Sequence, residues 1–176
     1  MRFYSLHDSV QASIAAHDYG IAASQAYETL SNVAWGLTAS DGPDGYKGNY
    51  GNLPSTGGNY NDGTLAPCGA IGSIAFTPDL VIPAIEHYAS IPNLQSKYGF
   101  SDAYNLGLTD TALPSVTKPL ASIPVSGWFN DWVIGIDKGI TVLMIENYRS
   151  GLIWHYFMQS DLVQSGLTEL EFSKKT

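Results

Sequence analysis

The chain has 176 residues, of which 44% are hydrophobic and 14% charged, enough to bury one sizeable core. We therefore expect residues 1–176 to form a single domain. The net charge is −8 with only eight lysines and arginines, so the chain offers no basic surface to a phosphate backbone. Nucleic acid is accordingly excluded as an expected partner, and a neutral or cationic ligand fits better.

Apolar stretches in the sequence are too short to cross a membrane. The longest, Ile140–Ile145, is far below the roughly 20 residues that a spanning helix needs, and it runs into Glu146. The segment from Met1 to Asp8 lacks the apolar region of a signal peptide. We expect no membrane contact for this chain, and whether a longer parent is periplasmic or exported stays open.

Metal and cofactor motifs are not found in the sequence. Cys68 has no second cysteine to pair with, and its Ala-Pro-Cys-Gly-Ala setting is typical of a small buried residue. The histidines at 7, 17, 87 and 155 lack the spacing of zinc ligands. Neither a Gly-x-Ser-x-Gly elbow nor a phosphate-binding loop occurs, which argues against serine hydrolase and nucleotide chemistry. We expect no metal and no cofactor.

Apolar periodicity predicts helices over Ser9–Leu30, from Thr77 to the interruption at Ser90, over Lys138–Ser150, and over Leu152–Gln164. Thr77 is predicted to cap the second helix through its hydroxyl, with Pro78 at the first helical position. Pro83 is predicted to kink or break that helix. The third helix is apolar nearly all round, which predicts burial on every side. Gly151 is expected to separate the last two helices.

Two long segments between these helices are rich in Gly, Pro, Asn and Asp. They run over residues 31–67 and 100–130. Tyr50 and Tyr60, among other aromatic residues in the first segment, argue against disorder, so we interpret it as a functional loop. The class is mainly α with long loops.

Three segments carry more specific patterns. They are Trp35–Tyr46 followed by Asp62–Pro67, then Tyr98–Asn105, then Gly135–Trp154. In this order they closely resemble the glucoamylase-like (glycoamylase) domain of bacterial polysaccharide-utilising proteins. That family is related to endo-β-1,2-glucanases and to a region of cyclic β-1,2-glucan synthases. The resemblance extends from about Ser9 to Met158.

The resemblance implies an (α/α)6 toroid, in which inner helices surround a cleft built from loops. Such a domain is more than twice as long as this chain, so residues 1–176 are expected to be its C-terminal half. At least one catalytic carboxylate would then lie in the preceding half. Ala16-His17-Asp18-Tyr19 departs from the family pattern, which has a basic residue there.

Glycoside hydrolysis needs one protonated carboxyl group and one ionised carboxylate. Our candidates are Asp102, as the ionised carboxylate, together with Glu146 and Asp137. Each has a structural alternative: Asp102 and Asp137 as helix caps, and Glu146 in an ion pair with Arg149. Glu146 in its apolar helix is otherwise a candidate general acid or substrate ligand.

Aromatic and short polar residues are the usual partners of sugar rings, because a pyranose presents both C–H faces and hydroxyls. The expected substrate-binding residues are Trp35, Asp41, Asp44, Tyr46, Asp62, Tyr104, Asn105, Trp128, Tyr148 and Arg149. Core packing for the aromatics and Asx-turns for Asp41 and Asp44 are the alternatives.

The expected function is hydrolysis of a β-linked glucan, preferably β-1,2-glucan, with an oligo- or polysaccharide as partner. Two alternatives stay open: a non-catalytic glycan-binding piece, and the transglycosylating region of a cyclic β-1,2-glucan synthase. An isolated half-ring would expose the helix around Ile140–Ile145, so the missing N-terminal half or a second copy is a further expected partner.

Overall fold

The computed structural model describes residues 2–3, 6–51, 60–108 and 127–173. Helices dominate these residues, so the predicted mainly α class is confirmed. The helices are α1 (Leu6–Ala23), α2 (Pro67–Ile71), α3 (Pro78–Ser90), α4 (Gly135–Ser150), α5 (Leu152–Met158) and α6 (Asp161–Glu169). None of the helices in the described ranges is long and apolar enough to cross a membrane.

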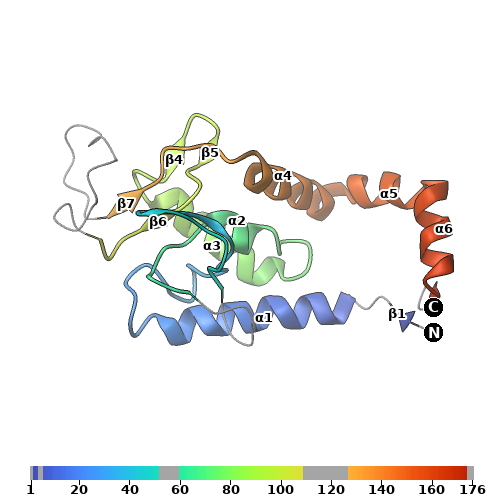
Figure 1. The fold of residues 1–176 in the computed structure, drawn as a ribbon, viewed down its shortest axis with the longest axis horizontal. Coiled ribbons are helices and arrows are strands. Elements are labelled where there is room, and N and C mark those ends of the chain that lie inside the picture. Colours follow the sequence, from blue (N-terminus) through green and yellow to red (C-terminus); the bar gives the residue numbers. More distant parts are fainter. Residues whose placement is uncertain (1, 4–5, 52–59, 109–126, 174–176) are drawn as a thin grey trace.

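The segments outside the helices contain short strands of two or three residues each, and these strands form pairs. Three pairs are antiparallel: β2 (Ser40–Gly42) with β3 (Gly45–Lys47), β4 (Gln95–Ser96) with β5 (Gly99–Phe100), and β6 (Tyr104–Asn105) with β7 (Trp128–Phe129). The pair β1 (Arg2–Phe3) and β8 (Phe172–Ser173) is parallel. These pairs form no common sheet, and two of them, β2–β3 and β4–β5, are hairpins that project near the start of α4 (Figure 1).

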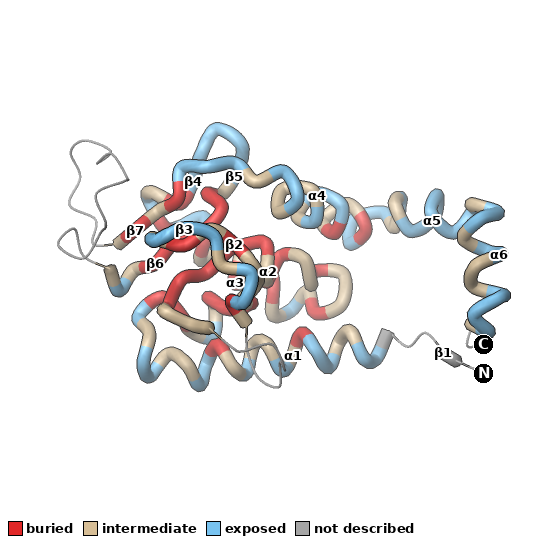
Figure 2. The backbone as a smooth tube through the Cα atoms, in the orientation of Figure 1, coloured by how far each residue is buried: buried red, intermediate tan, exposed pale blue. Residues whose placement is uncertain are grey.

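The core lies around α2 and α3, where the buried residues gather (Figure 2). Its largest fully buried side chains include Trp35, Tyr88 and Tyr104. Tyr88 contacts Tyr104 edge-on, with ring centroids 6.2 Å apart, and its hydroxyl donates to the Trp35 carbonyl at 3.3 Å. Helix α1 lies along one side of this core, whereas α4 packs against α2, and α5 and α6 extend away from it (Figure 1).

Two glycines allow the chain to approach α2 closely. Gly36 has a φ of +90°, in the left-handed region that favours glycine. A Cβ added to Gly69 would lie 1.8 Å from the Gly36 carbonyl oxygen, which no side chain can occupy. The contact therefore requires glycine at both positions, and it holds the loop after Trp35 against the first turn of α2.

Helix α1 ends at Ala23, so the prediction that it reaches Leu30 is wrong. The Ser24 hydroxyl donates to the Ile21 carbonyl at 2.7 Å, offering the backbone an alternative to the next helical bond. The single helix predicted over Leu152–Gln164 is also wrong, because α5 ends at Met158 and α6 begins at Asp161. Ser160 between them has an extended backbone.

Helix α3 begins at Pro78, as predicted, and ends before Ile91. The expected cap is wrong, however, because the Thr77 hydroxyl makes no capping hydrogen bond and is buried without a partner. A break at Pro83 is wrong too, since the helix runs through it. Pro83 lies in the second turn, where only one backbone hydrogen bond is lost.

Helix α4 is not buried on every side, contrary to the expectation from its composition. Met144 and Asn147 are buried, whereas Val142 is 64% exposed. The helix packs against α2 with one side only, and the opposite side has no neighbour among the described residues. Exposed apolar residues of α4, α5 and α6, named here the apolar arm, are Ile136, Ile140, Val142, Leu143, Tyr156, Phe157, Met158, Leu162 and Leu170.

Replacing Gly69 tests the glycine contact. We expect Gly69→Ala to lower the free energy of unfolding by at least about 2 kcal/mol, because the added methyl group forces the backbone of Gly36 away. Gly139→Ala is the matched control: an added Cβ there meets nothing within 4 Å, and the change should stabilise α4 by up to about 1 kcal/mol. Urea unfolding of both variants measures this. Equal stability of Gly69→Ala and the original chain would contradict the prediction.

Candidate active site

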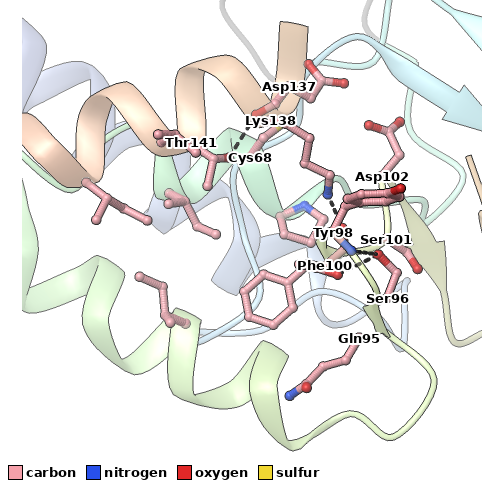
Figure 3. Close-up of a pocket in the computed structure, with 16 residues that line it drawn as sticks. Cys68, Gln95, Ser96, Tyr98, Phe100, Ser101, Asp102, Asp137, Lys138 and Thr141 are labelled. Carbon is pink, nitrogen blue, oxygen red and sulfur yellow. Dashed lines mark hydrogen bonds between the residues drawn. The ribbon is translucent and has the colours of Figure 1, made fainter. Parts of the chain in front are cut away.

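Two cavities meet at the start of α4. The larger has a volume of about 430 Å³ and lies between α2, the β4–β5 hairpin and α4 (Figure 3). The smaller, of about 190 Å³, lies beside the β2–β3 hairpin. Asp102 and Asp137 line both cavities. The structure thus brings together two of the three carboxyl groups that the sequence marked as catalytic.

Asp102 is the most unusual residue of the site. It is 2% exposed, and neither oxygen of its carboxyl group has a hydrogen-bond partner among the described residues. Backbone hydrogen bonds fix the chain on both sides of it. The Ser101 amide donates to the Leu94 carbonyl at 2.6 Å, and Leu65 and Tyr104 exchange two bonds of 2.9 Å. The carboxyl group is therefore held in place by the backbone and left without a partner.

Burial raises the pKa of the Asp102 carboxyl from its ordinary value of 3.8 to about 7. The nearby carboxyl group of Asp137 raises the pKa further, first by its polar contact with the protonated form of Asp102 and then by charge repulsion. The backbone of Asp41 acts in the opposite direction but does not offset the burial. At neutral pH the group therefore exists in both protonated and ionised forms, which suits proton transfer.

Asp137 and Asp41 complete the acidic part of the site. Asp137 lies in the first turn of α4, whose N-cap position belongs to Ile134, so Asp137 does not cap the helix as its structural alternative required. Asp41, on β2, lines the smaller cavity and accepts a hydrogen bond from the Asn130 side chain at 3.2 Å. Within the described residues no group of three or more His, Cys, Asp or Glu side chains could hold a metal ion.

Glu146 lies further along α4 and lines neither cavity. Its carboxylate pairs with Arg149 at 3.4 Å and accepts from the Ser150 hydroxyl at 2.5 Å. The ion pair proposed as its structural alternative is confirmed. Arg149 is largely exposed, so the pair lies at the surface, away from the residues that line the two cavities, and the catalytic role of Glu146 and the substrate contact of Arg149 stay predictions.

Several expected stacking residues are part of the core. Trp35 and Tyr104 are fully buried and Trp128 is 4% exposed, so none presents a ring face to a sugar. These placements agree with the core-packing alternative: the His17 ring, for example, packs edge-on against Trp35 with ring centroids 5.5 Å apart. Tyr46 is 69% exposed and lines the smaller cavity, as a stacking residue should, whereas the exposed Tyr148 lines neither cavity.

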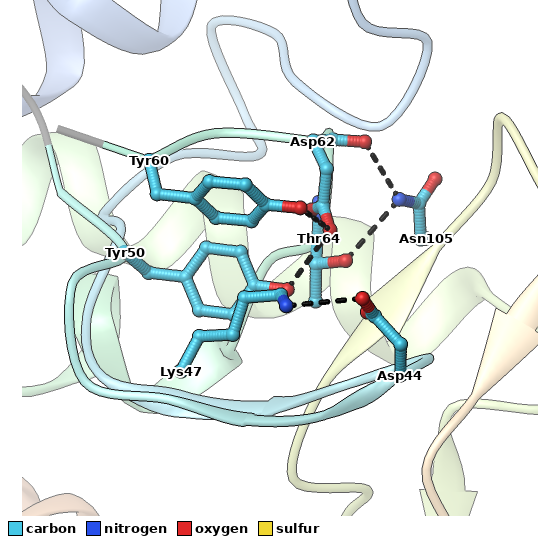
Figure 4. Close-up of polar contacts among 7 residues, drawn as sticks. All are labelled: Asp44, Lys47, Tyr50, Tyr60, Asp62, Thr64 and Asn105. Atoms are coloured by element: carbon cyan, nitrogen blue, oxygen red, sulfur yellow. Dashed lines mark hydrogen bonds and ion pairs between the residues drawn. The ribbon is translucent and has the colours of Figure 1, made fainter.

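Asp62 and Asn105 belong to a hydrogen-bond network within the fold (Figure 4). Asp62 accepts from the Tyr50 hydroxyl at 3.0 Å and the Tyr60 hydroxyl at 3.3 Å. The Asn105 side-chain amide donates to the Asp62 carbonyl at 2.9 Å and to the Thr64 hydroxyl at 3.2 Å. Neither residue lines either cavity, and their substrate contacts stay predictions.

Asp44 forms a similar local contact. It pairs with Lys47 at 3.1 Å across the exposed β2–β3 turn and lines neither cavity, so its expected role in substrate binding stays a prediction. The turn alternative considered for Asp44 agrees with this position.

Tyr98, Lys138 and Cys68 also line the larger cavity, and the sequence analysis did not select them. Lys138 donates a hydrogen bond to the Phe100 carbonyl, which ties α4 to the β4–β5 hairpin. Cys68 is buried, as predicted, and burial raises the pKa of its thiol to about 12, so it stays protonated. Tyr98 could have been identified from its position in a turn, before Gly99 and only four residues from Asp102 in the sequence.

Comparison with known proteins identifies the family of this chain. The sequence matches the Glycoamylase family, described as "Putative glucoamylase", over residues 4–161. The chain belongs to the Glycoamylase family. The resemblance inferred from the three sequence segments is thereby confirmed.

Among curated proteins, this Glycoamylase chain is 31% identical over 150 residues to an exo-β-1,2-glucooligosaccharide sophorohydrolase (non-reducing end) from Parabacteroides distasonis. The match covers 84% of this chain but only 18% of that protein. The chain therefore spans less than a fifth of the length of this relative.

Solved structures agree. An endo-β-1,2-glucanase from Chitinophaga pinensis, in complex with sophorotriose and glucose, superposes with a TM-score of 0.71 at 28% identity, covering 92% of this Glycoamylase chain and 34% of that one. A β-1,2-glucanase from Parabacteroides distasonis gives 0.71 at 29% identity, covering 90% and 20%. Both are glucanases built on the same helical arrangement.

The raised pKa of Asp102 predicts how stability depends on pH. Between pH 4 and 7 the folded chain keeps the proton that the unfolded chain has lost, so stability falls as pH rises through this window. Each pH unit of the window removes about 1.4 kcal/mol. Asp102→Asn cannot ionise, and we expect it to be more stable than the original chain by about 1–3 kcal/mol at pH 8.

Urea unfolding at pH 4 and pH 8 measures this difference. At pH 4 the advantage of Asp102→Asn should largely disappear, because the Asp102 carboxyl is protonated in the folded chain and only about half ionised in the unfolded chain. An advantage of equal size at both values would show that burial does not act on ionisation of Asp102.

Proposed function

We propose that this chain is part of a glycoside hydrolase that cleaves β-1,2-glucan, with Asp102 at the point of cleavage. The relatives named above act on β-1,2-linked glucose, which supports the linkage. The observation that carries the proposal is Asp102: its carboxyl group is buried without a hydrogen-bond partner among the described residues, and the residue lines two cavities. A polar group is left in this state at a cost, which a purely structural carboxyl would avoid.

The raised pKa gives Asp102 a different role from the one expected from the sequence. A carboxyl group that keeps its proton near neutral pH can protonate the glycosidic oxygen as it leaves, so we assign Asp102 the general acid role instead of the ionised carboxylate role. Burial is the main cause of the raised pKa of Asp102, and the nearby carboxyl group of Asp137 adds to it. The second carboxylate that the reaction requires is expected in the part of the parent protein outside this chain.

We also propose that the chain is part of an (α/α)6 toroid. The chain covers 34% or less of the length of the glucanases and the sophorohydrolase compared above. We infer that the described helices are one part of an (α/α)6 ring, and that further helices of the parent protein cover the apolar arm. Exposed apolar side chains on this scale are typical of surfaces that are covered in the complete protein.

An assay of cleavage on glucans of different linkage tests the proposed function. The parent protein, with the helices that complete the ring, should release short oligosaccharides from β-1,2-glucan and leave β-1,3- and β-1,4-glucans intact. Asp102→Asn should lower kcat on β-1,2-glucan by about 10²–10⁴-fold, because it removes the proton donor while preserving shape.

Glu146→Gln is the matched control, since it also replaces a carboxylate by an amide but at the surface of α4, and turnover should change less than about threefold. Normal turnover by Asp102→Asn would overturn the assignment. Binding of β-1,2-glucan without cleavage by the parent protein would favour the glycan-binding alternative.

A second experiment tests the assistance from Asp137. If the charge of Asp137 helps to keep Asp102 protonated, Asp137→Asn should move the alkaline limb of the kcat/KM profile to lower pH, by up to about one unit. The pH profile of the parent protein on β-1,2-glucan measures this shift. A uniform loss of activity at every pH would instead indicate a structural or substrate-contact role for Asp137.

A further inference from the structure

Two exposed tyrosines line the two cavities that share Asp102. Tyr98, on the β4–β5 hairpin, lines the larger cavity and is 61% exposed. Tyr46, on the β2–β3 hairpin, lines the smaller cavity and is 69% exposed. Asp102 and Asp137 line both cavities, so each tyrosine shares a cavity with both carboxyl-bearing residues.

We propose that Tyr98 and Tyr46 are sugar-stacking platforms on opposite sides of the cleavage point, so that a bound glucan extends from one cavity across Asp102 into the other. This inference rests on the proposed function and adds to it the direction of the substrate chain. Aromatic faces bind the C–H faces of pyranose rings, and neither ring is needed to fill the core.

The Tyr98 ring is carried by a turn that is fixed by its neighbours. The Ser96 hydroxyl accepts from the Tyr98 amide at 3.2 Å and donates to the Gly99 carbonyl at 2.7 Å. Gly99 has a φ of +91°, which the two-residue turn requires. The backbone is therefore set while the ring remains exposed. In Figure 3 the Tyr98 ring lies on the side of the larger cavity where Asp102 is found.

The base of the same hairpin is held on two sides. The Phe100 ring packs edge-on against Tyr88 in the core, with centroids 5.9 Å apart. The Phe100 carbonyl accepts the hydrogen bond from Lys138 on α4. A platform on such a support keeps its position relative to the adjacent Asp102, and position is what selects one sugar ring for cleavage.

The Tyr46 ring has an equivalent support. Asp41 and Tyr46 are paired across the β2–β3 hairpin, and Asp41 is held by Asn130 at 3.2 Å. The Tyr50 hydroxyl lies so close to Gly42 that a Cβ there would be 2.3 Å from it, so the hairpin rests directly on Tyr50. Tyr46 therefore extends from a fixed strand pair into the smaller cavity.

The two cavities differ in volume, so we expect the two parts of a bound oligosaccharide, one in each cavity, to differ in length. The larger is about 430 Å³ and the smaller about 190 Å³, so the longer part of a bound oligosaccharide should lie on the Tyr98 side. Removal of the Tyr98 ring should then weaken binding of long substrates more than removal of the Tyr46 ring does.

Cleavage of end-labelled β-1,2-gluco-oligosaccharides by the parent protein tests the proposal. Tyr98→Ala should raise KM about three- to tenfold, with kcat changed less, because one stacking contact is lost. The cleavage position should move toward one end of the labelled oligosaccharide in Tyr98→Ala and toward the opposite end in Tyr46→Ala. Tyr→Phe at either position keeps the ring and should keep the original cleavage pattern.

Lys97→Ala is the matched control within the same turn. It removes the cation 5.2 Å from the Tyr98 ring while leaving the ring itself, so KM and the cleavage pattern should stay close to those of the original protein. Far-UV circular dichroism and thermal unfolding check that every variant is folded. The proposal is overturned if both alanine variants shift cleavage in the same direction, or if neither shifts it.

Failure of the proposed function would give a different result. If the original parent protein cleaves no β-glucan, the platforms can still be measured by calorimetric titration with β-1,2-gluco-oligosaccharides. Weaker binding by Tyr98→Ala and Tyr46→Ala than by Lys97→Ala would then support the platforms alone. Unchanged affinity in both variants would overturn them.

Discussion

The contact between Gly36 and Gly69 is the constraint on which the rest of the described fold depends. Because neither position can carry a side chain, the loop after Trp35 lies directly on the first turn of α2. This contact places Trp35 in the core, where Tyr88 reaches its carbonyl. Helix α2 in turn supports α4, and the start of α4 carries Asp137 to the cavities. A contact between two backbone segments thus helps to determine where the acidic residues meet.

The chain holds Asp102 by bonds that do not involve its carboxyl group. Leu94, Leu65 and the Asn130 amide all bind backbone atoms of the residues next to it. A neighbouring backbone amide could have donated a hydrogen bond to the Asp102 carboxyl group, as the Thr64 amide does to Asp62. Among the described residues none does. The unpartnered carboxyl group of Asp102 lowers the stability of the fold, and the surrounding backbone hydrogen bonds offset this cost. This arrangement is expected of a residue that acts on a ligand.

Local signals in the sequence were enough to locate most helices. Pro78 marked the start of α3, and Gly151, with its φ of +69°, marked the end of α4. Proline and glycine act through the backbone of their own residue, so their effects can be predicted without the fold. The break between Met158 and Asp161 was missed because neither residue type occurs there.

The site was predicted less completely, because exposure depends on distant contacts. Nothing in the local sequence separates Trp35, which the glycine contact buries, from Tyr46, which stays exposed. Glu146 was selected for its apolar helix, but the helix packs on one side only and leaves Glu146 paired with Arg149 at the surface. Asp102 was selected for its irregular, glycine-containing segment, and the structure leaves its carboxyl oxygens without a hydrogen-bond partner among the described residues.

The turn at Lys97 and Tyr98 separates two properties that most binding sites combine. The hydroxyl of Ser96, the conformation of Gly99 and the packing of Phe100 hold the hairpin, and none of these depends on the side chain at position 98. A mutation at this position can therefore alter what the larger cavity accepts while the protein still folds. The hairpin is in this sense an evolvable part of the molecule: new specificities can arise at Tyr98 one substitution at a time, without compensating changes in the core.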